Sequence, residues 1–149
     1  MRNWGDEFDL HIDEVIKKAG QMIIGTQTEE GVTMIYTVGL AEAGLPEVVC
    51  FGLPTTHAGM LNEVADLLRK GELPLDTPIN GISTNLALVF KAVQPERGIG
   101  YVNYANARAG RPVNLIQLVW PDRKGEYPWS KKFNKKMRQS QPCLFEATN

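Results

Sequence analysis

Residues 32–53 read VTMIYTVGLAEAGLPEVVCFGL, and this segment determines the type of sheet. Its two ends, residues 32–40 and 47–53, are rich in β-branched and aromatic residues, which is typical of strands. The connection AEAGLP between them is short enough to let the two strands pair antiparallel. The sequence therefore predicts a sheet in which neighbouring strands are joined by short loops.

On the N-terminal side, the pattern predicts a hairpin preceded by a helix. QMIIGTQT, residues 21–28, is expected to be a strand that turns through EEG, where Gly31 can take positive φ. A helix is expected over Leu10–Ala19 because apolar residues recur there at helical spacing. Asp9 is expected to cap this helix and Gly20 to end it.

On the C-terminal side, strands and helices are mixed. A helix is expected to open at Pro54 with Thr55 or Thr56 as its cap and to end at Gly71. The remaining predicted elements are a loop after this helix, strands over 85–93 and 112–120, a short helix over 101–110 ended by Gly110, and a last helix over 130–139. Strands cluster early without regular β-α-β alternation. We therefore predict an α+β fold with a mainly antiparallel sheet of about five strands and three or four helices.

Size and composition indicate one compact domain over residues 1–149. The net charge of −1 gives no general attraction to nucleic acid or to anionic lipid, so a nucleic-acid partner is not expected. No apolar run is long enough to span a membrane. The N-terminus is acidic and lacks the apolar core of a secretion signal, so the expected location is the cytoplasm.

No familiar catalytic or cofactor motif appears in the sequence, so neither catalytic residues nor a cofactor are expected. Cys50 and Cys143 are expected to be buried, reduced thiols. With His11 and His57 they show no zinc-finger spacing, so no metal site is predicted. A nucleophile pair of one cysteine with His57 stays an alternative.

The segment FGLPTTHAG, residues 51–59, is one candidate site. It places Thr55, Thr56 and His57 where a predicted strand meets the start of a predicted helix. Free backbone N–H groups at a helix start attract an anion, so these three residues are a candidate anion site. The alternative is that a threonine only caps the helix and His57 lies on its surface.

The segment LVWPDRKGEYPW, residues 118–129, is the second candidate site. Two Trp-Pro pairs enclose a charged turn around Asp122. We expect Trp120 to be buried and Trp129 to be more exposed, because only Trp120 ends an apolar strand. Either the segment is a rigid anchored loop or it presents an interaction surface. The residues proposed for that surface are Asp122, Tyr127, Trp129, Lys131, Lys132 and Lys135.

The C-terminal SKKFNKKMRQ, residues 130–139, is strongly basic. On a helix its lysines would stack at i, i+4 spacing, which mildly opposes helix formation. A compensating anion, either an acidic patch of a partner or a phosphate, is one interpretation. The alternative is a solvated basic face, or a pairing with the acidic N-terminal helix of the chain itself.

Four blocks in the sequence carry a resemblance: YTVGL, LPEVVCFGLP, MLNEVADLLRKGE and QLVWPDRKGEYPW. In this order and spacing the chain resembles the bacterial family called domain of unknown function 4262 over residues 36–129. The N-terminal helix (1–20) and the basic tail (130–149) lie outside this core. The family has no settled activity, so the resemblance implies no catalytic residue. The chain also has a strand, then Pro-Glu, a second strand, Leu-Pro and a helix. This order resembles suppressor-of-fused-like bacterial domains, which are interaction or immunity modules.

A non-catalytic binding protein is the function that these features favour. Another protein is the expected partner and a small anionic ligand the second choice. The second resemblance suggests a role in bacterial conflict, as immunity or counter-defence. The alternative is a small enzyme or binder that acts on a phosphorylated or nucleotide-like molecule around His57. Convergence of Tyr36, Thr55, His57 and Asp122 in one pocket would favour this alternative.

Overall fold

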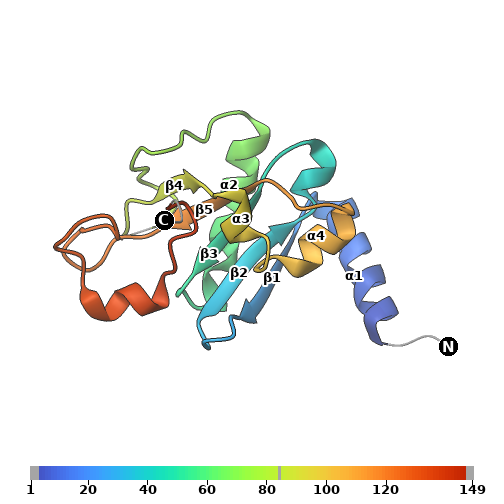
Figure 1. Ribbon diagram of the computed structural model, residues 1–149. Coiled ribbons are helices and arrows are strands. Elements are labelled where there is room, and N and C mark those ends of the chain that lie inside the picture. The colour runs from blue at the N-terminus through green and yellow to red at the C-terminus, as the bar shows by residue number, and fades with distance from the viewer. Residues whose placement is uncertain (1–3, 84, 147–149) are drawn as a thin grey trace.

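A five-stranded sheet forms the centre of the computed structural model, which describes residues 4–83 and 85–146. Its strands are β1 (Met22–Gln27), β2 (Thr33–Val38), β3 (Glu47–Phe51), β4 (Val89–Ala92) and β5 (Leu115–Val119), in the order β1-β2-β3-β5-β4 (Figure 1). Neighbouring strands pair antiparallel except β3 and β5, which run parallel. The predicted α+β fold with a mainly antiparallel sheet is therefore confirmed.

Helices cover both faces of this sheet (Figure 1). The described residues form α1 (Trp4–Ala19), α2 (Ala58–Arg69), α3 (Pro95–Gly98) and α4 (Asn103–Ala109), and the 3-10 helices η1 (Leu40–Ala43), η2 (Thr55–His57) and η3 (Lys135–Ser140). None of the helices within the described ranges is long and apolar enough to cross a membrane. The helix α2 packs on one face, and α1 and α4 pack on the other.

The alternation of side chains along each strand produces two apolar layers. On the first face, Ile35, Cys50 and Leu118 pack with Leu61 and Val64 of α2. The second layer contains Met34, Tyr36, Val38 and Phe51 of the sheet together with Ile12 of α1 and Ala105 of α4. Every residue of β5 is buried, as expected for a strand with neighbours on both sides and helices on both faces.

Local turn signals in the sequence are borne out by the backbone. Gly20, which ends α1, has φ 90°, and Gly31 in the β1–β2 turn has φ 85°. Gly110 ends α4 with φ 71°. Positive φ costs glycine little because it has no Cβ, so these residues mark element ends dependably.

Two predicted helix starts are wrong. The helix α1 begins at Trp4, so Asp9 lies inside it and does not cap it. The apolar stripe that suggested a start at Leu10 is only the part of the helix that packs on the sheet. At the other junction, neither Thr55 nor Thr56 caps a helix by a side-chain hydrogen bond; they belong to η2, which precedes α2.

The predicted last helix over residues 130–139 is also wrong. Turns occupy its first half, and only η3 follows. The backbone N–H of Asn134 donates to the Asp122 carboxylate (2.8 Å), and Phe133 is buried. These contacts favour turns over a helix in which lysines would stack. Figure 1 shows this C-terminal segment at the end of the molecule opposite α1.

Candidate functional site

Glu47 lies in the block LPEVVCFGLP and is a buried acidic residue with 1% exposure. Thr37 Oγ1 donates to its carboxylate (2.7 Å) and accepts from Val48 N (2.8 Å). The carboxylate also accepts from three backbone N–H groups at the start of η1: Gly39 (3.1 Å), Leu40 (3.2 Å) and Ala41 (3.0 Å). Burial raises the pKa of Glu47, and these hydrogen bonds oppose the rise. Glu47 of β3 therefore links β2 and η1 to its own strand, and its carboxylate accepts hydrogen bonds from groups inside the protein.

The strand–helix junction brings Thr55, Thr56 and His57 into the single turn η2. Thr55 lies against β1, because a Cβ built on Gly25 would come within 2.8 Å of its Cγ2. The Nδ1 atom of His57 is buried and has no hydrogen-bond partner among the described residues. Anion binding at this junction stays a prediction.

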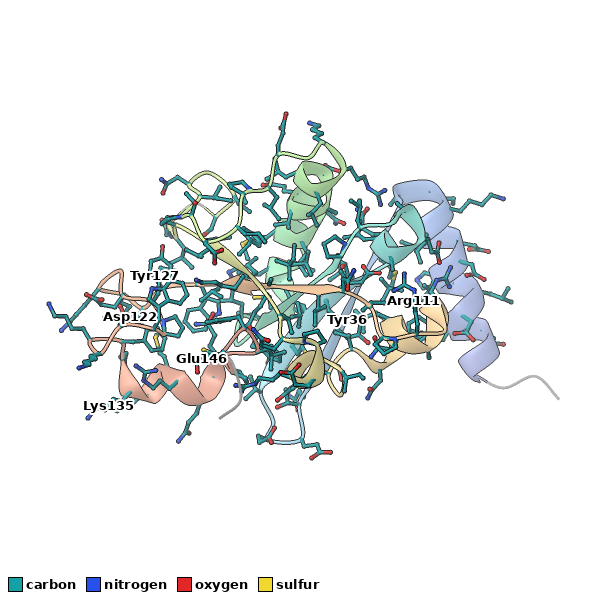
Figure 2. All side chains as sticks on the ribbon, turned by 45° about the horizontal axis from the view of Figure 1, so that its top comes forward. Tyr36, Arg111, Asp122, Tyr127, Lys135 and Glu146 are labelled. Atoms are coloured by element: carbon teal, nitrogen blue, oxygen red, sulfur yellow. The ribbon has the colours of Figure 1, made fainter. Side chains whose placement is uncertain are left out.

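The four residues whose convergence would favour the small-molecule alternative, Tyr36, Thr55, His57 and Asp122, do not all lie together. Thr55 lines a surface hollow beside β1, whereas Tyr36 lines a groove between the β1–β2 hairpin and α4. Asp122 lies in the C-terminal loop, which Figure 2 shows at the opposite end of the molecule from α1 and away from Tyr36. The small-molecule alternative around His57 therefore lacks the convergence that would favour it.

Both cysteines are free thiols. Cys50 is fully buried, as predicted, and burial raises its pKa to about 12. Cys143 is only half-buried, and burial followed by the charge of Glu146 raises its pKa to about 11. Both thiols are therefore protonated at neutral pH, which disfavours a thiolate nucleophile.

The second candidate site includes Asp122, which was expected on its surface but is only 5% exposed. Its Oδ1 accepts from Lys124 N and Glu126 N, both at 2.9 Å, and its Oδ2 accepts from Asn134 N. Burial acts to raise the pKa of Asp122, but these backbone hydrogen bonds outweigh burial and lower it. Gly125, with φ 84°, completes the turn. Asp122 thus holds the loop in shape.

Trp120 and Arg138 anchor the two sides of the loop. Trp120 is 6% exposed, and its Nε1 donates to the Phe51 carbonyl of β3 (2.7 Å). The Arg138 guanidinium donates to the carbonyls of Pro128 (2.8 Å) and Ser130 (2.9 Å). The segment between the two prolines is therefore fixed before any partner arrives.

On this fixed loop Trp129 is 46% exposed and belongs to an aromatic cluster. The Tyr127 ring stacks on it at a centroid distance of 4.9 Å and an angle of 5°, and Phe145 meets it edge-on at 5.9 Å. Lys91 Nζ lies 4.6 Å from the Trp129 ring centroid. The Tyr127 hydroxyl donates to the Ala87 carbonyl (2.6 Å), which fixes the stack. The predicted difference between a buried Trp120 and an exposed Trp129 is confirmed.

Basic residues are concentrated in the sequence around Tyr127 and Trp129. Seven of the chain's 16 lysines and arginines lie between Arg123 and Arg138, and Glu126 is the one acidic residue in that span. Lys131, Lys132 and Lys135 are exposed, and none of the seven forms a salt bridge with a described residue. We call Lys91, Tyr127, Trp129 and Phe145, with the flanking Lys131 and Lys132, the Trp129 surface. Lys135 begins η3 beyond it.

The acidic N-terminal helix does not neutralise these lysines. Asp13 of α1 pairs instead with Arg108 of α4 (2.6 Å), which also pairs with Glu42 (2.7 Å). These partners raise the pKa of Arg108 despite its partial burial. The proposed pairing between α1 and the tail is therefore wrong, and the basic segment keeps its charge.

Tyr127, Trp129, Lys131 and Lys132 could be predicted together because they are close in the chain. Lys91 on β4 and Phe145 near the C-terminus could not, because they reach Trp129 only through the fold. Lys91 is brought there by the pairing of β4 with β5, and the segment before Phe145 is held by the Leu144 N–H, which donates to Gln117 Oε1 of β5 (2.9 Å). No local pattern indicates either contact.

The fold and this site define an α+β domain that presents a fixed, exposed aromatic cluster beside a run of basic side chains that form no salt bridge with the described residues. The chain belongs to the family described as domain of unknown function (DUF4262), whose model matches residues 15–134. The resemblance seen in the four sequence blocks is thereby confirmed. Comparisons with curated proteins and with solved structures give no match.

Proposed function

We propose that this protein is a non-catalytic binding module that docks an acidic segment of a partner protein on the Trp129 surface. The observation that carries the proposal is Trp129 itself, a large aromatic side chain left 46% exposed on a loop that is otherwise tightly anchored. Exposed aromatic anchors on preorganised loops are enriched among the residues that dominate binding energy.

The charge around Trp129 supports an acidic partner. Lys131 and Lys132 form no salt bridge with a described residue, so their charge is available to an incoming carboxylate. Lys91, which lies over the Trp129 ring, is already paired with Asp76 (2.9 Å). Complementary charge accelerates association and fixes orientation, while the buried aromatic contact supplies most of the affinity. An acidic segment with one aromatic or aliphatic residue would use both features.

The geometry favours a protein over a nucleic acid. Stacking on a base needs a free ring face, but the Tyr127 ring and the Lys91 ammonium already lie over the Trp129 ring. The exposed remainder of the indole suits a side chain that packs against it. The overall charge of −1 also gives no general attraction to a polyanion.

Selection of displayed random peptides on the 149-residue chain tests the chemistry of this partner. We expect enriched peptides to carry several Asp or Glu residues beside an aromatic or aliphatic one, and to bind more weakly as salt rises. A variant with Lys131→Ala and Lys132→Ala should bind them more weakly. Leu10→Ala, which removes an equally exposed apolar side chain from α1, is the matched control and should bind normally. Enrichment of uncharged or basic peptides would contradict the proposal.

A further inference from the structure

A groove lined by other residues is separate from the Trp129 surface. It has a volume of about 790 Å³ and lies between the β1–β2 hairpin and the segment that runs from α3 into α4. Met34 and Tyr36 of β2 form its floor, and both are more than nine-tenths buried. Sites for small molecules in proteins have volumes of this order.

The Tyr36 hydroxyl on this floor is only partly satisfied. Burial raises the pKa of Tyr36, whereas a hydrogen bond from the backbone of Tyr104 lowers it, and the net effect is a rise. The phenol oxygen therefore stays protonated at neutral pH and accepts one hydrogen bond. One lone pair of this oxygen remains to accept a hydrogen bond from a donor in the groove.

The walls add aromatic surface and negative charge. Tyr101 and Tyr104 line the α4 side, and the exposed carboxylates of Glu29, Glu30 and Glu96 lie along the rim. None of these three carboxylates forms a hydrogen bond or salt bridge with a residue in the described ranges. Three carboxylates without a salt bridge to a described residue, in a lining that also contains tyrosine rings, favour a bound cation.

Arg97 is the single basic residue among the described residues that line the groove. Its Nη1 donates to the Glu146 carbonyl (3.0 Å), so the guanidinium is held toward the C-terminal segment. The lining residues therefore keep an excess of negative charge, and an anionic ligand would face net repulsion there.

We propose that this groove binds a small organic cation, an ammonium or guanidinium group carried on an apolar or aromatic body. The cationic group lies among the rim carboxylates, and the apolar body packs on Met34 and the tyrosine rings. The Tyr36 phenol oxygen accepts a hydrogen bond from the cation. This site is distinct from the Trp129 surface, so the two proposals stand or fall separately.

Two probes that differ only in their charged group test this site. Phenethylammonium and 3-phenylpropionate share a ring and a two-carbon chain, and each is titrated into the 15N-labelled chain while amide shifts are followed by NMR. We expect phenethylammonium to shift the amides of Gly25, Gly100 and their neighbours. We expect 3-phenylpropionate to bind at least about tenfold more weakly.

A pair of variants shows whether the carboxylates are responsible. The double variant Glu30→Gln, Glu96→Gln should weaken phenethylammonium binding by about fivefold or more. The matched control is Glu63→Gln, Asp66→Asn, which neutralises two exposed carboxylates of α2 away from the groove and should bind as the wild type does. Equal binding of both probes, no groove shifts at tens of millimolar phenethylammonium, or unchanged binding by the Glu30, Glu96 variant would each overturn the proposal.

Discussion

Trp120 and Trp129 lie at the two ends of one loop but in opposite environments, 6% and 46% exposed. Trp120→Ala removes a core indole and its hydrogen bond to Phe51, so we expect a loss of about 3–5 kcal/mol in the free energy of unfolding. Trp129→Ala should cost much less, because much of its ring already contacts water. Urea unfolding of both variants measures the difference, and equal losses would show that both rings are structural anchors.

Glu47 gives a prediction about pH. Its folded pKa is raised by burial, so its titration stabilises the fold at acidic pH, and this contribution is lost as pH rises through the folded pKa. Glu47→Gln removes the titration and disturbs hydrogen bonds to the carboxylate, each worth about 1.5–3 kcal/mol. We therefore expect the variant's loss of unfolding free energy to be greater at about pH 4 than at about pH 8.

The control for Glu47 is Glu63→Gln, which changes an exposed carboxylate of α2. Its effect should stay within about 0.5 kcal/mol at both pH values. Chemical unfolding of wild type and both variants at the two pH values gives the comparison. A larger loss for Glu47→Gln at the alkaline pH would show that the folded pKa of Glu47 lies below its ordinary value.

The connection after β3 depends on a glycine. Gly52 has φ 82°, and an added Cβ would lie 2.8 Å from Trp120 Cζ2 and also clash with the Ser140 backbone. Gly52→Ala should therefore lower the free energy of unfolding by about 1–3 kcal/mol. Gly59 of α2 has open space around it, so Gly59→Ala should be neutral or stabilise by up to about 1 kcal/mol. Thermal melts that rank the two variants in the reverse order would contradict this account.

The Trp-Pro loop depends on the Asp122 carboxylate. Asp122→Asn replaces one of its acceptor oxygens by a donor group, so the amides of Lys124, Glu126 and Asn134 should exchange with solvent faster. Asp66→Asn on α2 changes an exposed side chain and should leave those amides protected. Hydrogen exchange measured by NMR tests this, and unchanged protection in Asp122→Asn would mean that other contacts hold the loop.

Elements defined by neighbouring residues could be predicted from the sequence. The β1–β2 hairpin and the ends of α1 and α4 follow from glycine positions and local periodicity. The place of β5 could not be predicted, because it inserts beside β3 as a parallel partner after a long excursion of the chain. The one-turn helix α3 was missed since four residues give no periodic signal.

The candidate site follows the same division between local and distant contacts. Tyr127, Trp129 and the adjacent lysines are close in sequence, so their grouping was predictable. Asp122 was wrongly expected on the surface, because a charged turn residue looks exposed until its backbone donors are known. The predicted helix over 130–139 failed for a related reason: tertiary contacts of Phe133 and Asn134 override local propensity.

Charge is segregated across the whole molecule. The carboxylates at Asp13 and Glu42 pair with Arg108 near α1, whereas the basic segment between Arg123 and Arg138 lies at the opposite end without salt bridges to described residues (Figure 1). The molecule therefore has one strongly basic end although its net charge is small. An acidic partner would be steered to that end and then held by the aromatic contact.

The most direct test compares the affinity of the wild type and of Trp129→Ala for one acidic peptide selected on the wild type. The account predicts binding about 30-fold weaker, equivalent to about 2 kcal/mol, with a melting temperature within a few degrees of the wild type. Leu10→Ala should match the wild type in both measurements. Unchanged affinity of Trp129→Ala for the peptide would contradict the claim that the Trp129 surface is where this protein meets its partner.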